Sequence, residues 1–101
     1  MNRKDLTWEQ VKSSLNFTPE EIAEIKLEEE LIEAEISARK KSKLSQKELG
    51  EKAGIKQPTI ARIESRARSP QVTTLIRMLY PMGYTLRVVP IENKVKQKSN
   101  K

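Results

Sequence analysis

The chain of 101 residues contains no cysteine and no histidine. Their absence excludes disulfide bonds, thiol chemistry and the usual zinc ligand sets, and it removes the commonest catalytic nucleophile and general base. The three glycines, Gly50, Gly54 and Gly83, are isolated from one another, which excludes a glycine-rich phosphate-binding loop. We therefore expect a protein that is not an enzyme and that needs no cofactor or metal ion.

Long apolar runs are also missing. No stretch approaches the roughly 20 residues that span a bilayer, and the first ten residues, MNRKDLTWEQ, lack the apolar segment of a signal peptide. We therefore expect a cytoplasmic protein without membrane contact. Hydrophobic residues make up 36% of the chain and charged residues 34%, which is enough for one small domain with a modest core.

Positive and negative charges are unevenly distributed along the chain. Residues 1–36 hold four basic and ten acidic residues, whereas residues 37–101 hold sixteen basic and four acidic ones. This asymmetry predicts two partners of opposite charge. The basic part would bind phosphate groups, and the acidic part would bind a basic protein or remain solvated.

The stretch from residue 44 to residue 70, LSQKELGEKAGIKQPTIARIESRARSP, predicts two helices joined by a tight turn. Ser45 is placed to cap the first helix, and Glu48 three residues later completes a capping box. Gly54 can adopt a positive φ and end that helix. The second helix is expected from Gln57 to Ser65.

A long helix is predicted to precede this unit. Thr18 is placed as its N-cap, with Pro19 as the first helical residue and Glu21 closing a capping box, and no glycine or proline follows before about Lys41. A shorter helix capped by Thr7 would come before it. The first half of the long helix carries apolar residues yet extends beyond the two-helix unit, so it needs another surface to pack on.

The part that follows residue 68 is expected to contain one more helix and one strand. Ser69 and Pro70 are placed to start the helix, and Gly83 follows its end. Residues 84–90, YTLRVVP, alternate in polarity and predict a single β-strand. Because one strand leaves its backbone unpaired, we expect it to pair with its copy in a dimer or with the sheet of a partner. Residues 92–101 form a basic tail that we expect to be disordered.

The two-helix unit resembles the helix-turn-helix of the XRE/Cro family. The motifs that carry the resemblance are Leu44-Ser45-Gln46, Glu48-Leu49, Ala53-Gly54-Ile55, Gln57-Pro58-Thr59-Ile60 and Ile63-Glu64. The resemblance covers roughly residues 31–82 and implies a helix-turn-helix bundle, which we place at residues 31–83. With the helical extension predicted over residues 1–30 and the C-terminal β-strand predicted over residues 84–91, the expected fold is mainly α. The chain departs from the family pattern at Arg66, where glycine is frequent, and at Lys56, where serine is frequent.

The family resemblance implies binding of double-stranded operator DNA, with the second helix in the major groove. Gln57 could bind adenine N6 and N7, and Arg62 could bind guanine O6 and N7. Gln46 would bind a backbone phosphate at the start of the preceding helix. The residues expected to contact DNA are Lys40, Gln46, Lys47, Lys56, Gln57, Thr59, Arg62 and Arg66.

The order of an acidic helical extension, an XRE domain and the ending Gly83-Tyr84-Thr85-Leu86-Arg87-Val88-Val89 resembles the HigA-like antitoxins. This resemblance implies repression of the protein's own operon and neutralisation of a basic RelE/HigB-like messenger-RNA endonuclease. One alternative is a stand-alone XRE-family repressor without a toxin partner. A third reading, from another class, is an RNA-binding or architectural helical module.

The acidic extension is the segment that we expect to contact the toxin. The residues assigned to that contact are Trp8, Val11, Leu15, Glu21, Ile22, Glu24, Ile25, Leu27 and Glu28. Because one recognition helix contacts too few bases for a selective site, we also expect a homodimer that binds a near-palindrome. Leu75, Leu79, Tyr80 and Met82, around the last helix, are expected at the dimer surface.

Overall fold

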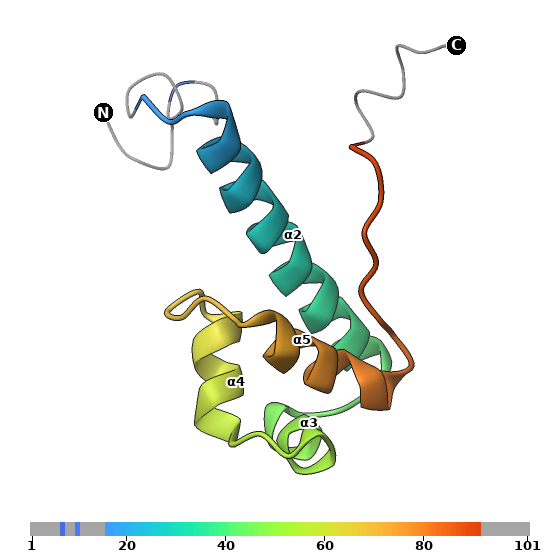
Figure 1. Cartoon of the computed structure of the whole chain (residues 1–101). Helices are drawn as coiled ribbons and strands as arrows, with labels where there is room; N and C mark the ends of the chain where they lie inside the picture. Colours follow the sequence, from blue (N-terminus) through green and yellow to red (C-terminus); the bar gives the residue numbers. More distant parts are fainter. Residues whose placement is uncertain (1–6, 8–9, 11–15, 92–101) are drawn as a thin grey trace.

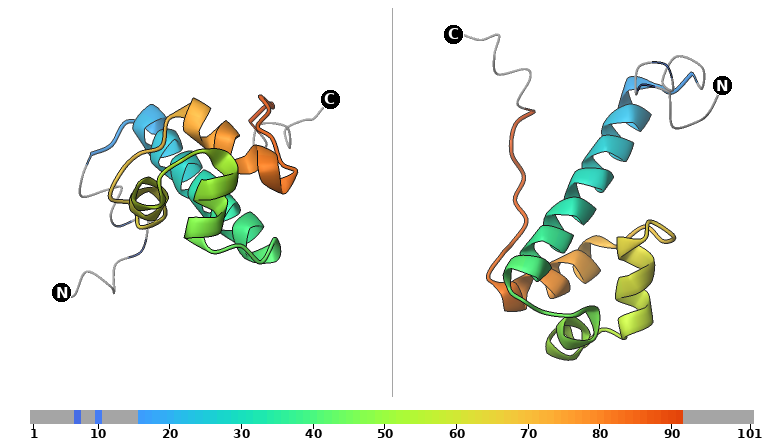
Figure 2. Two further views of the ribbon diagram at one scale, coloured as in Figure 1. Left: turned by 90° about the horizontal axis from the view of Figure 1, so that it is seen from below. Right: turned by 180° about the vertical axis from the view of Figure 1, so that it is seen from behind.

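The computed structural model of the chain, which describes residues 7, 10 and 16–91, consists of one long helix and a compact group of short ones (Figure 1). The helices, in chain order, are α2 (Pro19–Lys41), α3 (Gln46–Ala53), α4 (Gln57–Glu64), α5 (Val72–Leu79) and the 3-10 helix η2 (Tyr80–Met82). The C-terminal half of α2 packs with α3, α4 and α5, whereas its N-terminal half extends away from them (Figure 2). No helix within residues 16–91 is long and apolar enough to cross a membrane.

The start and end of α2 lie where the sequence predicts them. The Thr18 hydroxyl accepts a hydrogen bond from the Glu21 backbone N–H at 3.1 Å, and the Glu21 carboxylate accepts one from the Thr18 N–H at 2.9 Å. Thr7, the predicted cap of a shorter helix, forms the same reciprocal bonds with Gln10, at 3.1 and 2.9 Å. Trp8, Val11 and Leu15, which the sequence predicts to contact the toxin, lie outside the described residues.

The hydrophobic core joins α2 to the three short helices. Ile32 of α2, Leu49 of α3, Ile60 and Ile63 of α4 and Met78 of α5 are at most 2% exposed and pack together. Burial of such side chains stabilises the fold by about 1.5–3 kcal/mol each. The core therefore holds only the second half of α2 in place.

The turn between α3 and α4 follows the predicted pattern. Ser45 and Glu48 form the capping box at the start of α3, and Gly54 ends the helix with a φ of +70°. Gly50 is required for a different reason, because a Cβ atom there would lie 2.5 Å from the carbonyl oxygen of Ile55. Without a side chain at residue 50, the chain after α3 can fold back closely onto the helix.

The predicted start of the last helix is wrong. Ser69 and Pro70 lie outside it, and α5 begins at Val72 after Gln71, whose side chain forms no capping bond. The chain leaves α4 through Arg66, whose φ is +68°, and it stays irregular as far as Gln71. The helix therefore starts two residues after Pro70, the first helical residue that the sequence predicts.

The predicted C-terminal β-strand over residues 84–91 is also wrong, so the described fold is helical without a sheet. The Tyr84 N–H bonds the Leu79 carbonyl at 3.1 Å, and the chain then continues in a non-helical conformation. No strand is present among the described residues to supply a ladder of hydrogen bonds. Val88, in the middle of this segment, is fully exposed. Alternation of β-branched residues is thus not sufficient to form a strand.

Candidate nucleic-acid interface

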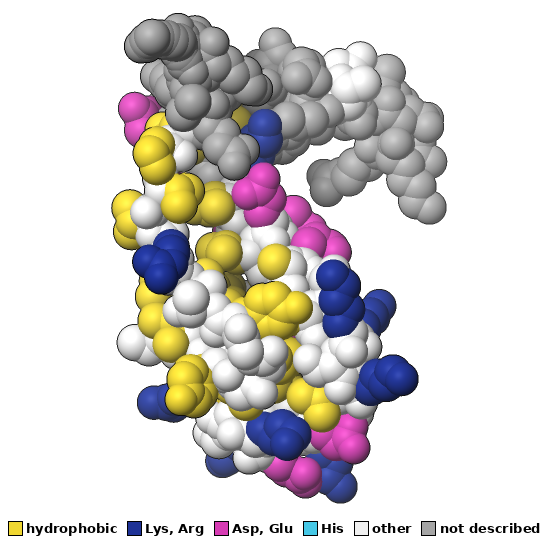
Figure 3. Space-filling view, turned by 90° about the vertical axis from the view of Figure 1, so that its right-hand side faces the viewer, with side chains coloured by type: hydrophobic (Ala, Val, Ile, Leu, Met, Phe, Trp, Pro, Cys, Tyr) yellow, Lys and Arg dark blue, Asp and Glu magenta, His cyan; other side chains and the backbone are white. Residues whose placement is uncertain are grey.

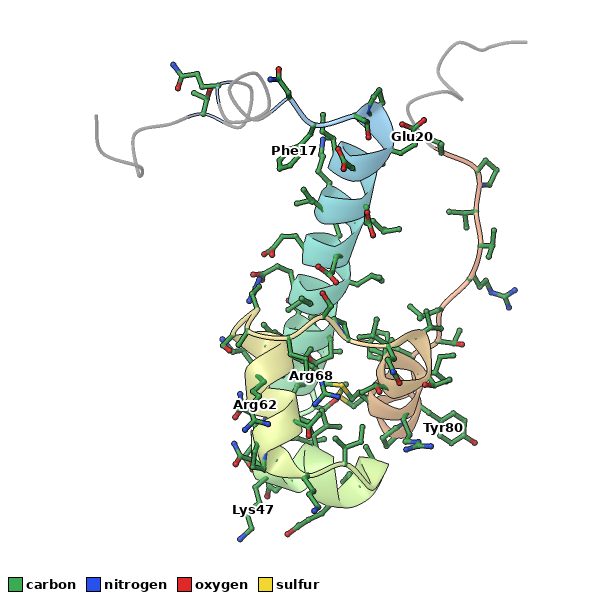
Figure 4. The ribbon with its side chains drawn as sticks, turned by 60° about the vertical axis from the view of Figure 1, so that its left-hand side comes forward. Phe17, Glu20, Lys47, Arg62, Arg68 and Tyr80 are labelled. Atoms are coloured by element: carbon green, nitrogen blue, oxygen red, sulfur yellow. The ribbon has the colours of Figure 1, made fainter. Side chains whose placement is uncertain are left out.

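The outer side of α4 presents polar side chains because the inner side is apolar. Ile60 and Ile63 are completely buried, which places Gln57 and Arg62 on the exposed side and leaves Thr59 half-buried. Arg62 on α4 and Lys47 on α3 both point away from Tyr80, which lies on the opposite side of the domain (Figure 4). The helix-turn-helix unit therefore has a polar face that is free of core packing.

A chain of side-chain hydrogen bonds fixes the amide of Gln57. Its Nε2 group donates to Gln46 Oε1 at 2.8 Å, and Gln46 Nε2 in turn donates to Glu64 Oε1 at 2.9 Å. Glu64 is only 7% exposed, so this series of hydrogen bonds connects the edge of the core to the surface. Gln57 keeps its Oε1 acceptor and its second N–H donor for another partner.

Arg39, near the C-terminal end of α2, anchors this chain of bonds. Its Nε and Nη2 atoms donate to the two oxygens of Glu64 at 2.9 and 2.8 Å, and Nη1 donates to the Leu44 carbonyl at 2.9 Å. Burial would raise the pKa of Glu64, but hydrogen bonds from Arg39 and Gln46 outweigh it and hold that pKa below its usual value. Arg39 thus connects α2, the α2–α3 turn and α4.

The sequence reasoning missed the pairing of Arg39 with Glu64. A usable signal existed, because Glu64 is the only acidic residue between Lys52 and Arg68, in a segment that is otherwise basic. An acidic residue that directly follows a core residue such as Ile63 is a candidate for a buried ion pair.

The side chain of Arg66, which the sequence predicts to contact DNA, instead contacts α2 in the structure. Its guanidinium forms ion pairs with Glu29 and Glu33, including an Nε bond to Glu29 at 3.0 Å, and its Nη1 donates to the Glu64 carbonyl at 2.6 Å. The hydrogen bond from Arg66 lowers the pKa of Glu29. Arg66 therefore connects the end of α4 to the acidic side of α2.

The three lysines predicted to contact DNA are all exposed. Lys40 lies at the end of α2, Lys47 in the first turn of α3, and Lys56 just before α4, where its side chain forms no capping bond. Lys47, Lys56 and Gln57 all line one shallow hollow of about 350 Å³. The candidate base-contacting residue and two positive charges thus share one surface.

Two of the four predicted dimer residues belong to the protein's own core, because Leu75 and Leu79 are only 2% and 7% exposed. Met82 is half-buried against that core, whereas Tyr80 is exposed. Tyr80 is spaced by four residues from the exposed apolar Ile76, and Ile76 from Val72, so these three share one side of the helix. We call these three residues the α5 stripe.

The residues assigned to a toxin contact are described only from Glu21 onward. Ile22 and Glu28 are half-buried, whereas Glu21, Glu24, Ile25 and Leu27 are exposed. Glu21, Glu24 and Glu28 are spaced three and four residues apart, so they follow one side of α2. Figure 3 shows hydrophobic side chains along one side of the molecule, with acidic side chains beside them in its upper half.

Comparison with known proteins identifies relatives of this architecture. A family model described as "Helix-turn-helix" matches residues 36–88. An HTH-type transcriptional regulator of Haemophilus influenzae is 41% identical over 87 residues, which cover 86% of this chain and 88% of that protein. Antitoxin HigA1 of Mycobacterium tuberculosis is 36% identical over 59 residues, 58% of this chain but only 40% of HigA1. A chain in the solved structure of a toxin–antitoxin module from Streptococcus pneumoniae is 40% identical, with a TM-score of 0.67, over 85% of this chain and 94% of that one.

Proposed function

Because this chain belongs to the XRE-type helix-turn-helix family of DNA-binding regulators and is related to HigA antitoxins, we propose that it is the antitoxin of a toxin–antitoxin pair. Its partner would be a basic RelE/HigB-like toxin that cleaves messenger RNA, and the antitoxin would also repress its own operon. Both activities would take place in the cytoplasm.

One observation carries this proposal. The likeness to the Streptococcus pneumoniae toxin–antitoxin chain covers 85% of this chain, whereas the helix-turn-helix model covers residues 36–88 alone. The likeness therefore extends well beyond the DNA-binding unit and reaches at least part of α2 or of the residues before it. If the two proteins shared only the DNA-binding unit, the matched region would have ended near residues 36 and 88.

For DNA, we propose that α4 enters the major groove and that Gln57 and Arg62 contact bases. A glutamine amide suits adenine, which offers the N6 donor and the N7 acceptor, and a guanidinium suits guanine O6 and N7. Lys40, Lys47 and Lys56 would contact phosphates and supply the salt-dependent part of the affinity. Gln46 would position Gln57, because both atoms of its amide group already bond neighbouring side chains.

For dimerisation, we propose that the α5 stripe packs against its copy in a second chain. Val72 is 64% exposed, Ile76 43% and Tyr80 79%, and a shallow hollow of about 470 Å³ beside Ile76 and Tyr80 could receive an apolar side chain. A two-fold dimer would place two copies of α4 about one helical turn of DNA, ~34 Å, apart.

For the toxin, we propose that the N-terminal half of α2 supplies the contact. Ile25 and Leu27 are 39% and 55% exposed, and the core of the domain does not reach them. Apolar side chains that leave water gain roughly 1.5–3 kcal/mol each when fully buried. The nearby glutamates would attract a basic protein and would cover the positively charged surface with which it binds RNA.

Co-purification tests the proposal. The full chain should be expressed with the product of the neighbouring open reading frame and isolated through a tag on that product. We expect a complex that survives gel filtration, together with footprinting of both the free chain and the complex on the DNA upstream of the operon. Isolation of the tagged neighbour without this chain would refute the antitoxin assignment.

The second candidate function is a stand-alone repressor. The likeness to the Haemophilus influenzae transcriptional regulator favours it, because that match covers 88% of the relative. A stand-alone repressor would footprint the same DNA but would not bind the neighbouring gene product.

A further inference from the structure

Glu35 of α2 is a buried acidic residue without an apparent partner. It is 0% exposed, and nothing in the described part of the chain donates a hydrogen bond to either of its carboxylate oxygens. Its neighbour on α4 is Glu64, which is itself 7% exposed. An ionised carboxylate in such surroundings is strongly unfavourable, so a neutral Glu35 is the stable form.

The charges around Glu35 support a neutral side chain. α2 contributes Arg39 with one positive charge, and α4 contributes Glu64 with one negative charge that already balances it. The residue of α3 that bonds Glu64 is the uncharged Gln46, and the buried residues of α5 are the apolar Leu75, Met78 and Leu79. Burial raises the pKa of Glu35 to about 8, and the nearby Glu64 carboxylate raises it further than Arg39 lowers it.

Glu64 has room for one more hydrogen bond. Its Oε1 atom accepts two bonds, from Arg39 Nη2 and Gln46 Nε2, whereas its Oε2 atom accepts one, from Arg39 Nε. Each carboxylate oxygen can accept about two. A protonated Glu35 has one O–H donor, and Glu64 is the adjacent acceptor.

We propose that Glu35 is a positioning residue: its carboxyl proton completes the hydrogen bonds of Glu64, which hold Gln46 and, through it, the amide of Gln57. This inference rests on the proposed function only in that Gln57 is the residue that would contact DNA bases. Loss of the proton would place two negative charges beside a single guanidinium. Arg39 would then be shared between two carboxylates, and the bonds from Glu64 to Gln57 would loosen.

The proton also makes folding depend on pH. The pKa of a glutamate in an unfolded chain is about 4.3. Between that value and the folded value of about 8, the folded form of Glu35 binds one proton more than the unfolded form. The contribution of Glu35 to stability is therefore fully present at acidic pH, and the folding equilibrium constant falls about tenfold per pH unit until pH 8, where it levels off.

Carbon-detected NMR of the full chain, titrated from pH 5 to pH 10, tests the proposal without DNA. We expect the Glu35 Cδ signal to titrate with a midpoint near pH 8, and the Cδ signals of Gln46 and Gln57 to shift with the same midpoint. A Glu35 midpoint below pH 6 would overturn the proposal, as would Gln46 and Gln57 signals that stay constant while Glu35 titrates. Both outcomes are measured on the unmodified protein.

A matched pair of variants isolates the proton. Glu35→Gln supplies a permanent N–H donor to Glu64, so the Gln46 and Gln57 shifts near pH 8 should disappear and the tenfold loss of folding per pH unit should be absent. Glu30→Gln changes an exposed glutamate on the same helix and should behave as the unmodified chain does. Equal pH profiles for Glu35→Gln and the unmodified chain would contradict the proposal. If Gln57 then proves not to contact DNA, the proposed base contact is wrong, whereas the assignment of the proton to Glu35 is unaffected.

Discussion

Arg39 and Glu64 form a two-bond ion pair across the domain, with side-chain exposures of 13% and 6%. Residues 25 positions apart in the sequence are thereby joined at the point where α2, α3 and α4 meet. The carboxylate of Glu64 also accepts a bond from Gln46, and Gln46 accepts one from Gln57. The same pair that stabilises the fold therefore supports the residue that we propose to contact bases.

Substitution of Arg39 should lower the free energy of unfolding strongly. Arg39→Leu would leave Glu64 buried without its positive partner, and breaking one side of a buried pair typically costs about 3–5 kcal/mol. Urea denaturation of the variant should show a loss of this size at pH 7. Lys41→Leu, at an exposed position two residues later, should change the free energy of unfolding by less than about 0.5 kcal/mol. Equal effects of the two substitutions would show that the ion pair contributes little.

Gly50 should not tolerate a methyl group. A Cβ atom there would lie 2.5 Å from the Ile55 carbonyl oxygen, so Gly50→Ala would push the α3–α4 turn away from α3. We expect a loss of about 1–3 kcal/mol, as for other overpacked sites. Thermal unfolding measures it, and an alanine at Lys52, exposed on the same helix, serves as the comparison. A Gly50→Ala protein as stable as the unmodified chain would contradict the close approach.

Arg62 and Lys47 should affect DNA binding in different ways. If Arg62 contacts a guanine, Arg62→Ala should weaken operator binding by about 1–3 kcal/mol and leave binding to random DNA nearly unchanged. Lys47→Ala should weaken binding to every sequence and reduce the salt slope by about one. Fluorescence anisotropy with the operon's upstream DNA and a scrambled duplex, at several salt concentrations, separates the two effects. Equal loss on both duplexes for Arg62→Ala would reassign Arg62 to phosphate contact.

A charge in the α5 stripe should abolish the dimer. Ile76 is 43% exposed in the single chain, so Ile76→Lys should leave the folded monomer intact but place a charge at the centre of the proposed contact. Sedimentation at micromolar concentration should show a dimer for the unmodified chain and a monomer for the variant. The control is lysine at the exposed Ser69, which lies outside both the α5 stripe and the hollow beside it. A monomeric unmodified chain, with or without DNA, would rule the contact out.

The helix-turn-helix could be predicted because its signals are local. The Ser45–Glu48 box, Gly54 and the spacing of Ile60 and Ile63 each specify structure within a few residues, and all agree with the observed turn. The long helix after Thr18 is likewise specified by its own first turn and by the absence of breaking residues.

Features that depend on residues distant in the sequence could not be predicted in the same way. A strand over residues 84–91 requires a neighbouring strand, which the described chain does not supply. The pairing of Arg66 with Glu29 and Glu33 depends on how α2 passes the end of α4. The inward side of α5 could not be assigned from the sequence because Leu75 and Ile76 are both apolar, and only the packing shows which one is buried.

The contribution of α2 to the toxin contact can be isolated by substitution. Replacing both Ile25 and Leu27 by Lys would add positive charge and remove the exposed apolar surface that we assign to the toxin, while the core of the domain is not touched. The control replaces the exposed Glu51 and Lys52 of α3 by alanine. We expect at least a tenfold loss of affinity for the neighbouring gene product in the Ile25/Leu27 variant alone, with unchanged DNA binding.

Suppression of messenger-RNA cleavage tests the antitoxin assignment most directly. The purified product of the neighbouring gene should be assayed on translating ribosomes while the full chain is added in increasing amounts. We expect cleavage to stop near a fixed ratio of the two proteins, and we expect the Ile25/Leu27 variant to require a large excess. Cleavage that continues unchanged in the presence of excess full chain, or a neighbouring product that cleaves no RNA, would contradict the proposal.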